Sequence, residues 1–288
     1  MNGSAIDPGL RVGSVTLAVS DLQRSVDFYE RMLGLPLLER SEDEARLGTD
    51  AARPALVLTA IADPEPVPVD STGLFHVAWL HPSRAALAAT IRRIIDAGWR
   101  FDGASDHGVS EALYLSDPDG LGIEIYADRP REAWERPAEG HGVRMMTLPL
   151  DVEDLLAQGD PSPTPAIAPG TGVGHVHMKV ADVPRAAAFY GGTLGFEEMA
   201  QMPSAAFLSA GGYHHHLGLN SWQSAGASRA PESAPGLQLV EFELPGEDAL
   251  GALERVLAAR APDALLGAEG GRVSVLDPDG QELAFAAP

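Results

Sequence analysis

Histidine and acidic side chains in apolar surroundings are the residues of this sequence that are best suited to chemistry. His76 lies in the apolar run LFHVAWL, and Glu124 is flanked by isoleucines in GIEIY. A carboxylate that faces the interior needs a partner such as a metal or a cation. Three consecutive histidines at 214–216 form another candidate group, and strand alternation would place the first and the third on one face. The ordinary alternatives are a hydrogen-bonded core histidine, a half-exposed glutamate and a histidine run in a surface loop.

The composition limits the chemistry that is available. The 288 residues include no cysteine, which excludes disulfides, thiolate metal sites, iron–sulfur clusters and a cysteine nucleophile. Any metal would therefore sit on histidine, on carboxylate or carbonyl oxygens, or on water. Acidic residues outnumber basic residues 41 to 20, and the formal charge of −21 argues against nucleic acid and anionic membranes as partners.

Neither a membrane span nor an export signal is expected. Apolar runs stay well short of the roughly 18 residues that a spanning helix needs. The N-terminal segment MNGSAIDPGLRVG lacks the basic and then apolar pattern of a secretory signal. The sequence therefore predicts a cytoplasmic enzyme or a cytoplasmic small-molecule binder.

The elements that must position the candidate residues occur twice in the chain. Residues 14–35 (SVTLAVSDLQRSVDFYERMLGL) match residues 175–196 (HVHMKVADVPRAAAFYGGTLGF) at a constant offset. A second pair, LYLSDPDGLGIEIYA (113–127) and VSVLDPDGQELAFAA (273–287), follows the same repeat. We therefore expect two homologous halves, each made of two modules with the order βαβββ.

The repeats and the composition between them predict the division of the chain. The intervening stretch is rich in proline, glycine and charge, which is typical of a linker rather than of a core element. The expected parts are an N-terminal tail (1–9), a first domain with modules one and two (10–128), a linker (129–171) and a second domain with modules three and four (172–288).

Capping residues mark the expected helices. Asp21 and Asp182 stand where the N-cap of a helix belongs, directly before apolar residues at helical spacing. Gly34 and Gly195 stand where the C-cap belongs. The equivalent positions in the two halves support one common plan for the repeats.

The ordered set of motifs resembles the vicinal oxygen chelate superfamily, which includes glyoxalase I, bleomycin-resistance proteins and type I extradiol dioxygenases. The segments GASDHGVSEALYLSDPDGLGIEIYADRPREAW, GHVHMKVAD and FLSAGGYHHHLGLNSW are most similar to two-domain bacterial catechol 2,3-dioxygenase-like proteins. The resemblance implies an α+β fold in which paired modules form incomplete mixed-sheet barrels around a divalent metal. It also implies a non-haem Fe(II) enzyme that cleaves a catechol-type aromatic in the extradiol (meta) mode, with O2 as co-substrate. Mn(II) in place of Fe(II) and a homo-oligomer are compatible with the resemblance.

Extradiol members of this superfamily use two histidines and one glutamate as metal ligands, supplied by the first and last strands of modules. Among the four first-strand positions, histidine stands only in modules two and three, as His76 and His175, whereas Ser14 and Leu239 stand in modules one and four. Glu124 occupies the last-strand position of module two. We therefore expect modules two and three to pair, with His76, Glu124 and His175 as the metal ligands.

One other arrangement remains open from the sequence. If the modules paired within each half, a site could form in the C-terminal half from His175, His216 and Glu241. Glu241 would need a shift of two residues from the matched position, and for that reason we rank this site second.

The resemblance also suggests residues around the metal. His216 resembles the histidine that acts as acid and base, or it could be a fourth ligand. Tyr114 lies ten residues before Glu124, as does the tyrosine that hydrogen-bonds the catecholate, and His107 lies in a loop that carries a further histidine near the metal. Two more residues, His214 and His177, are candidates for the pocket wall or for a fourth ligand.

Two alternative functions belong to the same superfamily. One is a glyoxalase-like isomerase or lyase, whose sites usually contain two carboxylates. The other is a metal-free small-molecule-binding protein of the resistance type, which usually lacks a complete ligand set. We see no lysine or arginine beside the ligand positions, and therefore no sequence indication of an anionic substrate.

Overall fold

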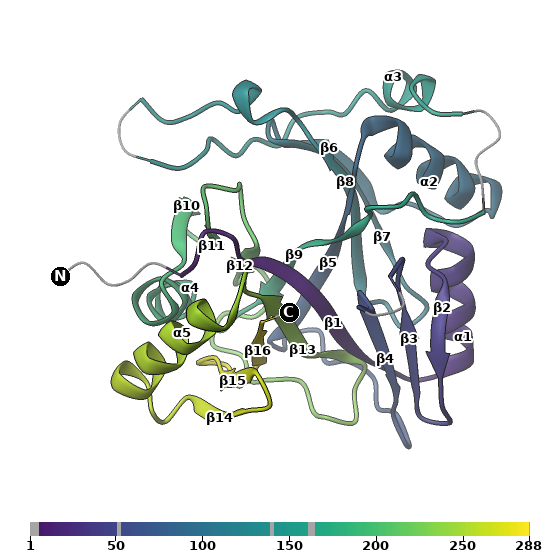
Figure 1. Cartoon of the computed structure of the whole chain (residues 1–288). Helices are drawn as coiled ribbons and strands as arrows, with labels where there is room; N and C mark the ends of the chain where they lie inside the picture. Colours follow the sequence, from purple (N-terminus) through teal and green to yellow (C-terminus); the bar gives the residue numbers. More distant parts are fainter. Residues whose placement is uncertain (1–5, 51–52, 139–140, 161–164, 288) are drawn as a thin grey trace.

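The computed structural model describes residues 6–50, 53–138, 141–160 and 165–287, and it contains two mixed β-sheets of eight strands each (Figure 1). Residues 1–5 of the expected tail and residues 139–140 and 161–164 of the expected linker lie outside the described residues.

The first sheet combines modules one and four. In spatial order it consists of β14 (Leu265–Glu269), β15 (Arg272–Leu276), β16 (Glu282–Ala286), β13 (Gly236–Glu243), β1 (Arg11–Val19), β4 (Leu56–Ala60), β3 (Glu44–Leu47) and β2 (Leu37–Arg40).

The second sheet combines modules two and three. In spatial order it consists of β10 (Glu197–Met202), β11 (Ala205–Ser209), β12 (Leu217–Asn220), β9 (Gly172–Lys179), β5 (Gly73–His81), β8 (Gly122–Asp128), β7 (Ser110–Ser116) and β6 (Gly103–Asp106).

Each sheet is therefore assembled from both halves of the chain. Antiparallel pairs between the first strands, β1 with β13 and β5 with β9, join the modules. Within every module the first strand pairs in parallel with the last strand. This topology confirms the four βαβββ modules and the pairing of module two with module three, and it brings residues of β5, β8 and β9 together.

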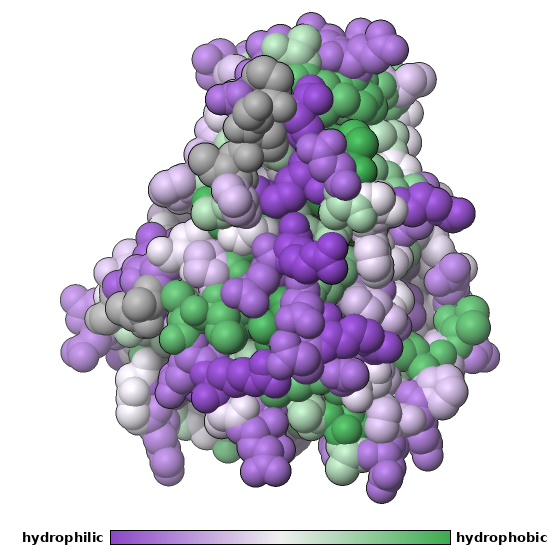
Figure 2. All heavy atoms as spheres, turned by 90° about the vertical axis from the view of Figure 1, so that its right-hand side faces the viewer, coloured by the Kyte–Doolittle hydropathy of each residue, from purple (hydrophilic) through white to green (hydrophobic). Residues whose placement is uncertain are grey.

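The helices lie at two sides of the molecule. The α-helices are α1 (Leu22–Phe28), α2 (Arg84–Asp96), α3 (Val152–Ala157), α4 (Val183–Ala187) and α5 (Glu247–Arg260). Helices α1 and α2 lie together at one side and α4 and α5 at the other (Figure 1). On the side of α1 and α2, polar side chains cover most of the surface and apolar side chains form separate groups (Figure 2).

The predicted caps are present in both halves. The carboxylates of Asp21 and Asp182 accept hydrogen bonds from backbone N–H groups in the first turns of α1 and α4. Gly34 and Gly195 end the π-helical turns that extend these helices, with φ of 71° and 88°. Glycine suits both positions because other residues rarely adopt this left-handed conformation.

The DPDG turns tie the modules to each other. Asp117 accepts hydrogen bonds from the backbone of its own turn, and Asp119 binds Arg24 and Ser20 at the start of module one's helix. In the other half Asp279 binds Arg185 at the start of α4 in the same way. The repeated turn therefore fixes the end of one module against the beginning of another.

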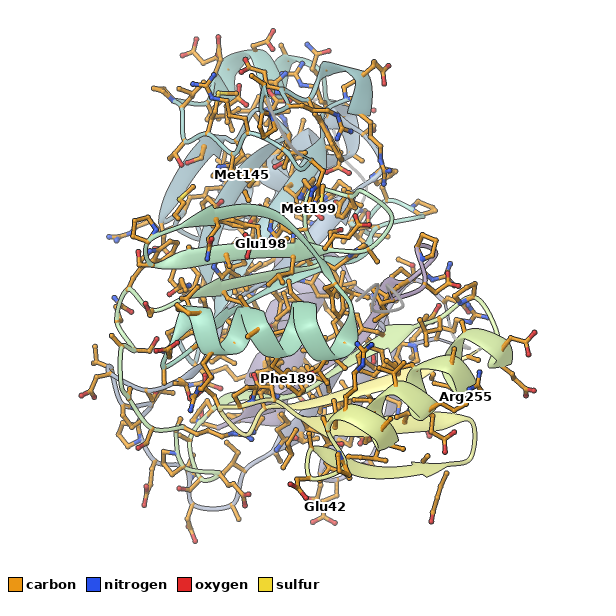
Figure 3. All side chains as sticks on the ribbon, turned by 90° about the vertical axis from the view of Figure 1, so that its left-hand side faces the viewer. Glu42, Met145, Phe189, Glu198, Met199 and Arg255 are labelled. Atoms are coloured by element: carbon orange, nitrogen blue, oxygen red, sulfur yellow. The ribbon has the colours of Figure 1, made fainter. Side chains whose placement is uncertain are left out.

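The segment between the halves takes part in the core, contrary to the expectation from its composition. Trp134 and Val143 pack with Met199 of β10 in a small apolar cluster. Met145 packs against the same cluster, and Figure 3 shows Met145 and Met199 close together. Leu155, on α3, is fully buried. Proline and glycine mark irregular backbone in this segment, but several of its apolar side chains are still buried.

None of the described helices combines the length and the apolar character that crossing a membrane would require.

Candidate metal centre

Strand pairing places the predicted ligands on one face of the second sheet. Glu124 of β8 pairs with Ala78 of β5, and Ala78 also pairs with His175 of β9. One step along the strands, His76 of β5 pairs with His177 of β9. Because side chains two residues apart in a strand share a face, His76 lies on the face of Ala78, next to Glu124 and His175.

Two irregularities adjust the position of these side chains. The pairing of β5 with β9 skips Phe75 on one strand and Gly174 on the other. A Cβ atom at Gly174 would lie 1.9 Å from the hydroxyl oxygen of Tyr126, so only glycine fits beside His175. Such bulges redirect side chains locally and often occur next to functional sites.

The three predicted ligands form a compact buried triad. The Oε2 atom of Glu124 lies 2.9 Å from Nε2 of His76 and 3.3 Å from Nε2 of His175. One possible ligand atom of each residue lies within 4.8 Å of the other two. Ligands at right angles with bonds of about 2.1 Å would be separated by about 3.0 Å. Two of the three separations already have this size.

The polar atoms of the triad lack other partners. Nε2 of His76 and both ring nitrogens of His175 are buried and make no hydrogen bond of acceptable geometry to any described residue. Buried polar atoms are normally paired, so atoms without a partner indicate a missing ligand or ion. Within the described part of the chain, the triad is the group of histidine and acidic side chains whose ligand atoms converge closely enough to hold a metal ion.

The protonation states of the triad suit metal binding. Burial alone would raise the pKa of Glu124, but the imidazoles of His175 and His76 outweigh it and hold the pKa well below its usual range. Burial lowers the pKa of His175 to about 4. A carboxylate and a neutral imidazole are the forms that bind a metal, so these two groups need lose no proton at neutral pH.

Tyr114 and His107 form a hydrogen-bonded pair beside the triad. Nδ1 of His107 donates to the carbonyl oxygen of Met146 at 2.7 Å, which leaves Nε2 to accept from the hydroxyl of Tyr114 at 2.6 Å. Burial and the nearby charge of Glu124 raise the pKa of Tyr114, so its hydroxyl keeps the proton. Met146 belongs to the segment between the halves, which therefore helps to orient this pair.

The histidine run does not follow the expected alternation, because β12 begins only at Leu217. The ring of His215, not that of His216, lies next to the triad, with its centroid 4.0 Å from that of His175. The expectation that the first and third histidines share the inward face is therefore wrong.

Hydrogen bonds define which nitrogen of His215 is free. Nε2 of His214 donates to Asp128 at 2.9 Å, so Nδ1 of His214 accepts from Nδ1 of His215 at 2.7 Å. Nε2 of His215 consequently carries a lone pair. Burial, followed by the nearby histidines, lowers the pKa of His215, which keeps the ring neutral.

His216 lies in different surroundings. Its Nδ1 accepts a hydrogen bond from the backbone of Ala210 and lies 3.1 Å from the hydroxyl of Ser209. Its side chain lines a cavity of about 510 Å³ that Arg131 and Tyr213 also line and that the triad residues do not. This position gives His216 a hydrogen-bonding role in the wall of that cavity.

Aromatic side chains line the region around His177. The ring centroid of His177 lies 5.0 Å from that of His76, 5.1 Å from Phe75 and 5.6 Å from Trp222. A Cβ atom at Gly218 would approach the ring of His177 to 2.7 Å, so the absent side chain makes room for this ring. Flat apolar walls of this kind suit an aromatic ligand.

An open cavity of about 370 Å³ reaches the triad. His76, Tyr114 and Phe75 are among its lining residues. Its volume is within the range of small-molecule sites. A ligand in this cavity would lie next to the triad and the Tyr114 hydroxyl.

The competing site in the C-terminal half is not assembled. Glu241 lies on β13 in the first sheet and pairs with Ser14 and Ala284, whereas His175 lies in the second sheet. The side chain of Glu241 lies 3.7 Å from Arg272. The register argument thus selected the arrangement that the structure has, and the shift of two residues does not occur.

Sequence reasoning missed three features near the triad. It did not single out His215, the Asp128 carboxylate that orients His214, or the aromatic wall of Phe75 and Trp222. Asp128 is the last residue of β8, but its partner His214 comes from the other half of the chain. No local signal in the sequence indicates such a contact.

The comparisons with known proteins agree with the fold. The model of the Glyoxalase/Bleomycin resistance protein/Dioxygenase superfamily matches residues 11–125 and 172–285. A catechol-2,3-dioxygenase of Bacillus subtilis (strain 168) is 40% identical over 250 residues, covering 86% of this chain and 87% of the relative.

Solved structures show the same fold at low sequence identity. Glyoxalase I from Zea mays has a TM-score of 0.57 at 16% identity and covers 97% of this chain and 92% of its own. A Bacillus subtilis protein provisionally assigned as a dioxygenase has a TM-score of 0.63 at 13% identity, with coverage of 99% and 86%. From the matched family model and the 40% identical relative, the chain belongs to the glyoxalase/bleomycin resistance protein/dioxygenase superfamily.

Proposed function

We propose that this chain is a non-haem Fe(II)-dependent extradiol dioxygenase that opens the ring of a catechol-type aromatic beside its two hydroxyl groups. The observation that carries the proposal is the buried His76–Glu124–His175 triad, whose His76 lines an open cavity. The name of the 40% identical relative, catechol-2,3-dioxygenase, supports it independently.

The donor set fits a divalent metal with open coordination positions. Two neutral imidazoles and one carboxylate on one face match the ligand type found in non-haem Fe(II) oxygenases, and Mn(II) accepts the same donors. When bound, such a metal would act as a Lewis acid on both catechol oxygens and would hold O2 beside the ring. Nε2 of His76, Nε2 of His175 and a carboxylate oxygen of Glu124 would hold it.

His215 would supply a proton acceptor for a catechol bound at the triad. The free lone pair on Nε2 of His215 can take the proton of a catechol hydroxyl. His214 and Asp128 hold His215 in the tautomer that leaves this nitrogen free. We assign His215 this role in place of His216, because its ring lies against His175.

Tyr114 and the aromatic side chains would position the substrate. The Tyr114 hydroxyl oxygen can accept a hydrogen bond from the substrate while it donates to His107. Phe75, His177 and Trp222 present ring surfaces beside the triad. Together these groups would orient a planar ring and keep water away from it.

The alternative functions receive less support from the site. A glyoxalase-type site has a second carboxylate, whereas the triad found among the described residues contains one. A metal-free binding protein would have no need of three converging donors whose ring nitrogens lack partners.

The test is metal content and ring cleavage in protein purified without oxygen and supplied with Fe(II). We expect about one iron per chain, oxygen uptake with a catechol, and the yellow semialdehyde product of extradiol cleavage. His76→Ala and His175→Ala should lose iron and activity, whereas His141→Ala, which alters an exposed histidine, should keep both. Wild-type protein that holds no metal, or that holds iron and cleaves no catechol, would overturn the proposal.

A further inference from the structure

The chain's single lysine, Lys179, lies on the same strand face as the triad. It follows His175 and His177 on β9 at intervals of two residues, so all three side chains share one face. Two residues of extended strand span about 7 Å. The Lys179 side chain therefore leaves β9 two residues beyond His177, the residue that pairs with His76.

Lys179 lines the cavity that reaches the triad at His76. The cavity of about 370 Å³ that His76 and Tyr114 line is also lined by Lys179. A neighbouring cavity of about 730 Å³ shares Lys179, Leu74 and Leu121 with it. A substrate bound at the triad would thus have room to extend a side chain toward the lysine.

The ammonium group has no partner of its own in the described part of the chain. No described carboxylate forms an ion pair with Lys179, and burial lowers the pKa of its ammonium group. Gly73 pairs with Lys179 across the sheet and places no side chain opposite it. A half-buried cation without a counter-ion is unfavourable, so binding of an anionic ligand group to Lys179 would be favourable.

The acidic residues of the smaller cavity already have partners. Asp119 binds Arg24 and Ser20, and Asp102 accepts a hydrogen bond from Ser116. These contacts keep both carboxylates engaged, and the lysine remains available to a ligand.

A second donor without a partner lies beside the lysine. Asn220 of β12 pairs in parallel with Lys179. Its side chain is fully buried, and its amide nitrogen has no hydrogen-bond partner among the described residues. Asn220 lines neither cavity, so the ammonium of Lys179, which lines both, is the donor that a carboxylate in them would meet first.

We propose that Lys179 determines substrate specificity by binding a carboxylate on the side chain of a catechol substrate. This inference rests on the proposed function, because the catechol at the triad is what brings the side chain toward Lys179. The negative charge of the whole chain does not prevent it, since charges more than about 8 Å apart are largely screened at physiological salt. A contact inside the cavity is screened much less.

The test compares acidic substrates with neutral substrates of the same shape. We would measure kcat/KM of the Fe(II)-loaded enzyme for 2,3- and 3,4-dihydroxyphenylacetate and for the corresponding acetamides. Lys179→Met should lower kcat/KM for a carboxylate substrate by about 10- to 100-fold, as expected for a lost charged hydrogen bond. The values for the amides should change less than about threefold, and Lys179→Arg should restore part of the loss.

Arg255→Met is the matched control for net charge. Arg255 is an exposed cation on α5 that lines neither cavity, and its removal changes the total charge by the same amount. An equal loss for both variants, or equal loss for acids and amides in Lys179→Met, would overturn the role of Lys179. If wild-type protein cleaves only the amides, the proposed function stands and the inference fails.

Binding measurements separate the two proposals further. If wild-type protein cleaves none of the four compounds, the proposed function fails. Calorimetry with the Fe(II)-loaded protein under nitrogen then measures the binding of the four compounds and tests whether Lys179 binds a carboxylate. Tighter binding of the acids than of the amides, lost in Lys179→Met, supports the carboxylate site, and equal binding refutes it.

Discussion

Glu124→Gln should abolish metal binding without weakening the metal-free fold. If the triad were a structural ion pair, loss of one partner would leave a buried charge and cost about 3–5 kcal/mol. If it is a metal site, the neutral amide removes a buried carboxylate that is only 3% exposed, and metal-free stability should change by less than about 1 kcal/mol. Metal at about 100 times its Kd stabilises the wild type by about 2.7 kcal/mol. In a chain of 288 residues that corresponds to a rise in Tm of about 4–5 °C.

Thermal unfolding with and without Mn(II) measures both the metal-free stability and the stabilisation by bound metal. Mn(II) avoids oxidation in air, and His141→Gln provides a control outside the site. We expect wild type and control to show the same rise in Tm and Glu124→Gln to show none, with similar midpoints for all three without metal. A metal-free midpoint of Glu124→Gln lowered by more than about 6 °C, together with no metal response of the wild type, would refute the reasoning.

Two further predictions concern the scaffold around the site. Burial lowers the pKa of His81 to about 4, below the usual value near 6.5, so unfolding free energy should fall by about 3 kcal/mol as the pH drops from 6.5 to 4. His81→Gln should flatten this part of the curve of stability against pH measured by urea unfolding, and an unchanged slope would contradict it. Gly218→Ala should push the ring of His177 aside, lowering stability by about 1–3 kcal/mol and kcat on a catechol, because the new Cβ would lie 2.7 Å from the ring. Gly236→Ala, where a Cβ meets no atom within 4 Å, is its control, and equal effects of both changes would argue against the packing explanation.

The repeat carried most of the information that made the fold predictable. Asp21 and Asp182 cap equivalent helices, and Gly34 and Gly195 end them with the same left-handed conformation. These local signals set the register of each module independently of its neighbours. Once the register is known, the type of residue at each first-strand position is sufficient to favour pairing of module two with module three.

The histidine run shows where local patterns stop being informative. Alternation applies only within a strand, and β12 begins after the run has ended. The orientation of His215 depends instead on a hydrogen bond to His214, which in turn depends on Asp128 from the other half of the chain. Contacts between distant segments decide the outcome here, and single-residue periodicity does not encode them.

Lys179 illustrates the same difficulty for specificity. In the sequence Lys179 directly follows the HVHM run, but a lysine near the end of a strand is usually exposed to solvent. Its position becomes meaningful only when β5 supplies Gly73 opposite it and β12 supplies Asn220 beside it. Three strands from modules two and three therefore define one subsite.

The two sheets share an architecture but differ in chemistry. Both are built from two modules whose first strands pair, and both keep the DPDG turn. In the first sheet the positions that correspond to ligands hold Ser14, Leu239 and Ala284, none of which supplies a strong metal donor. Residues of that sheet instead form part of the 730 Å³ cavity that meets the site cavity at Lys179. The first sheet, which lacks metal donors, would then help to select substrates by their shape. The second sheet, which has the donors, would carry the groups that react with the substrate.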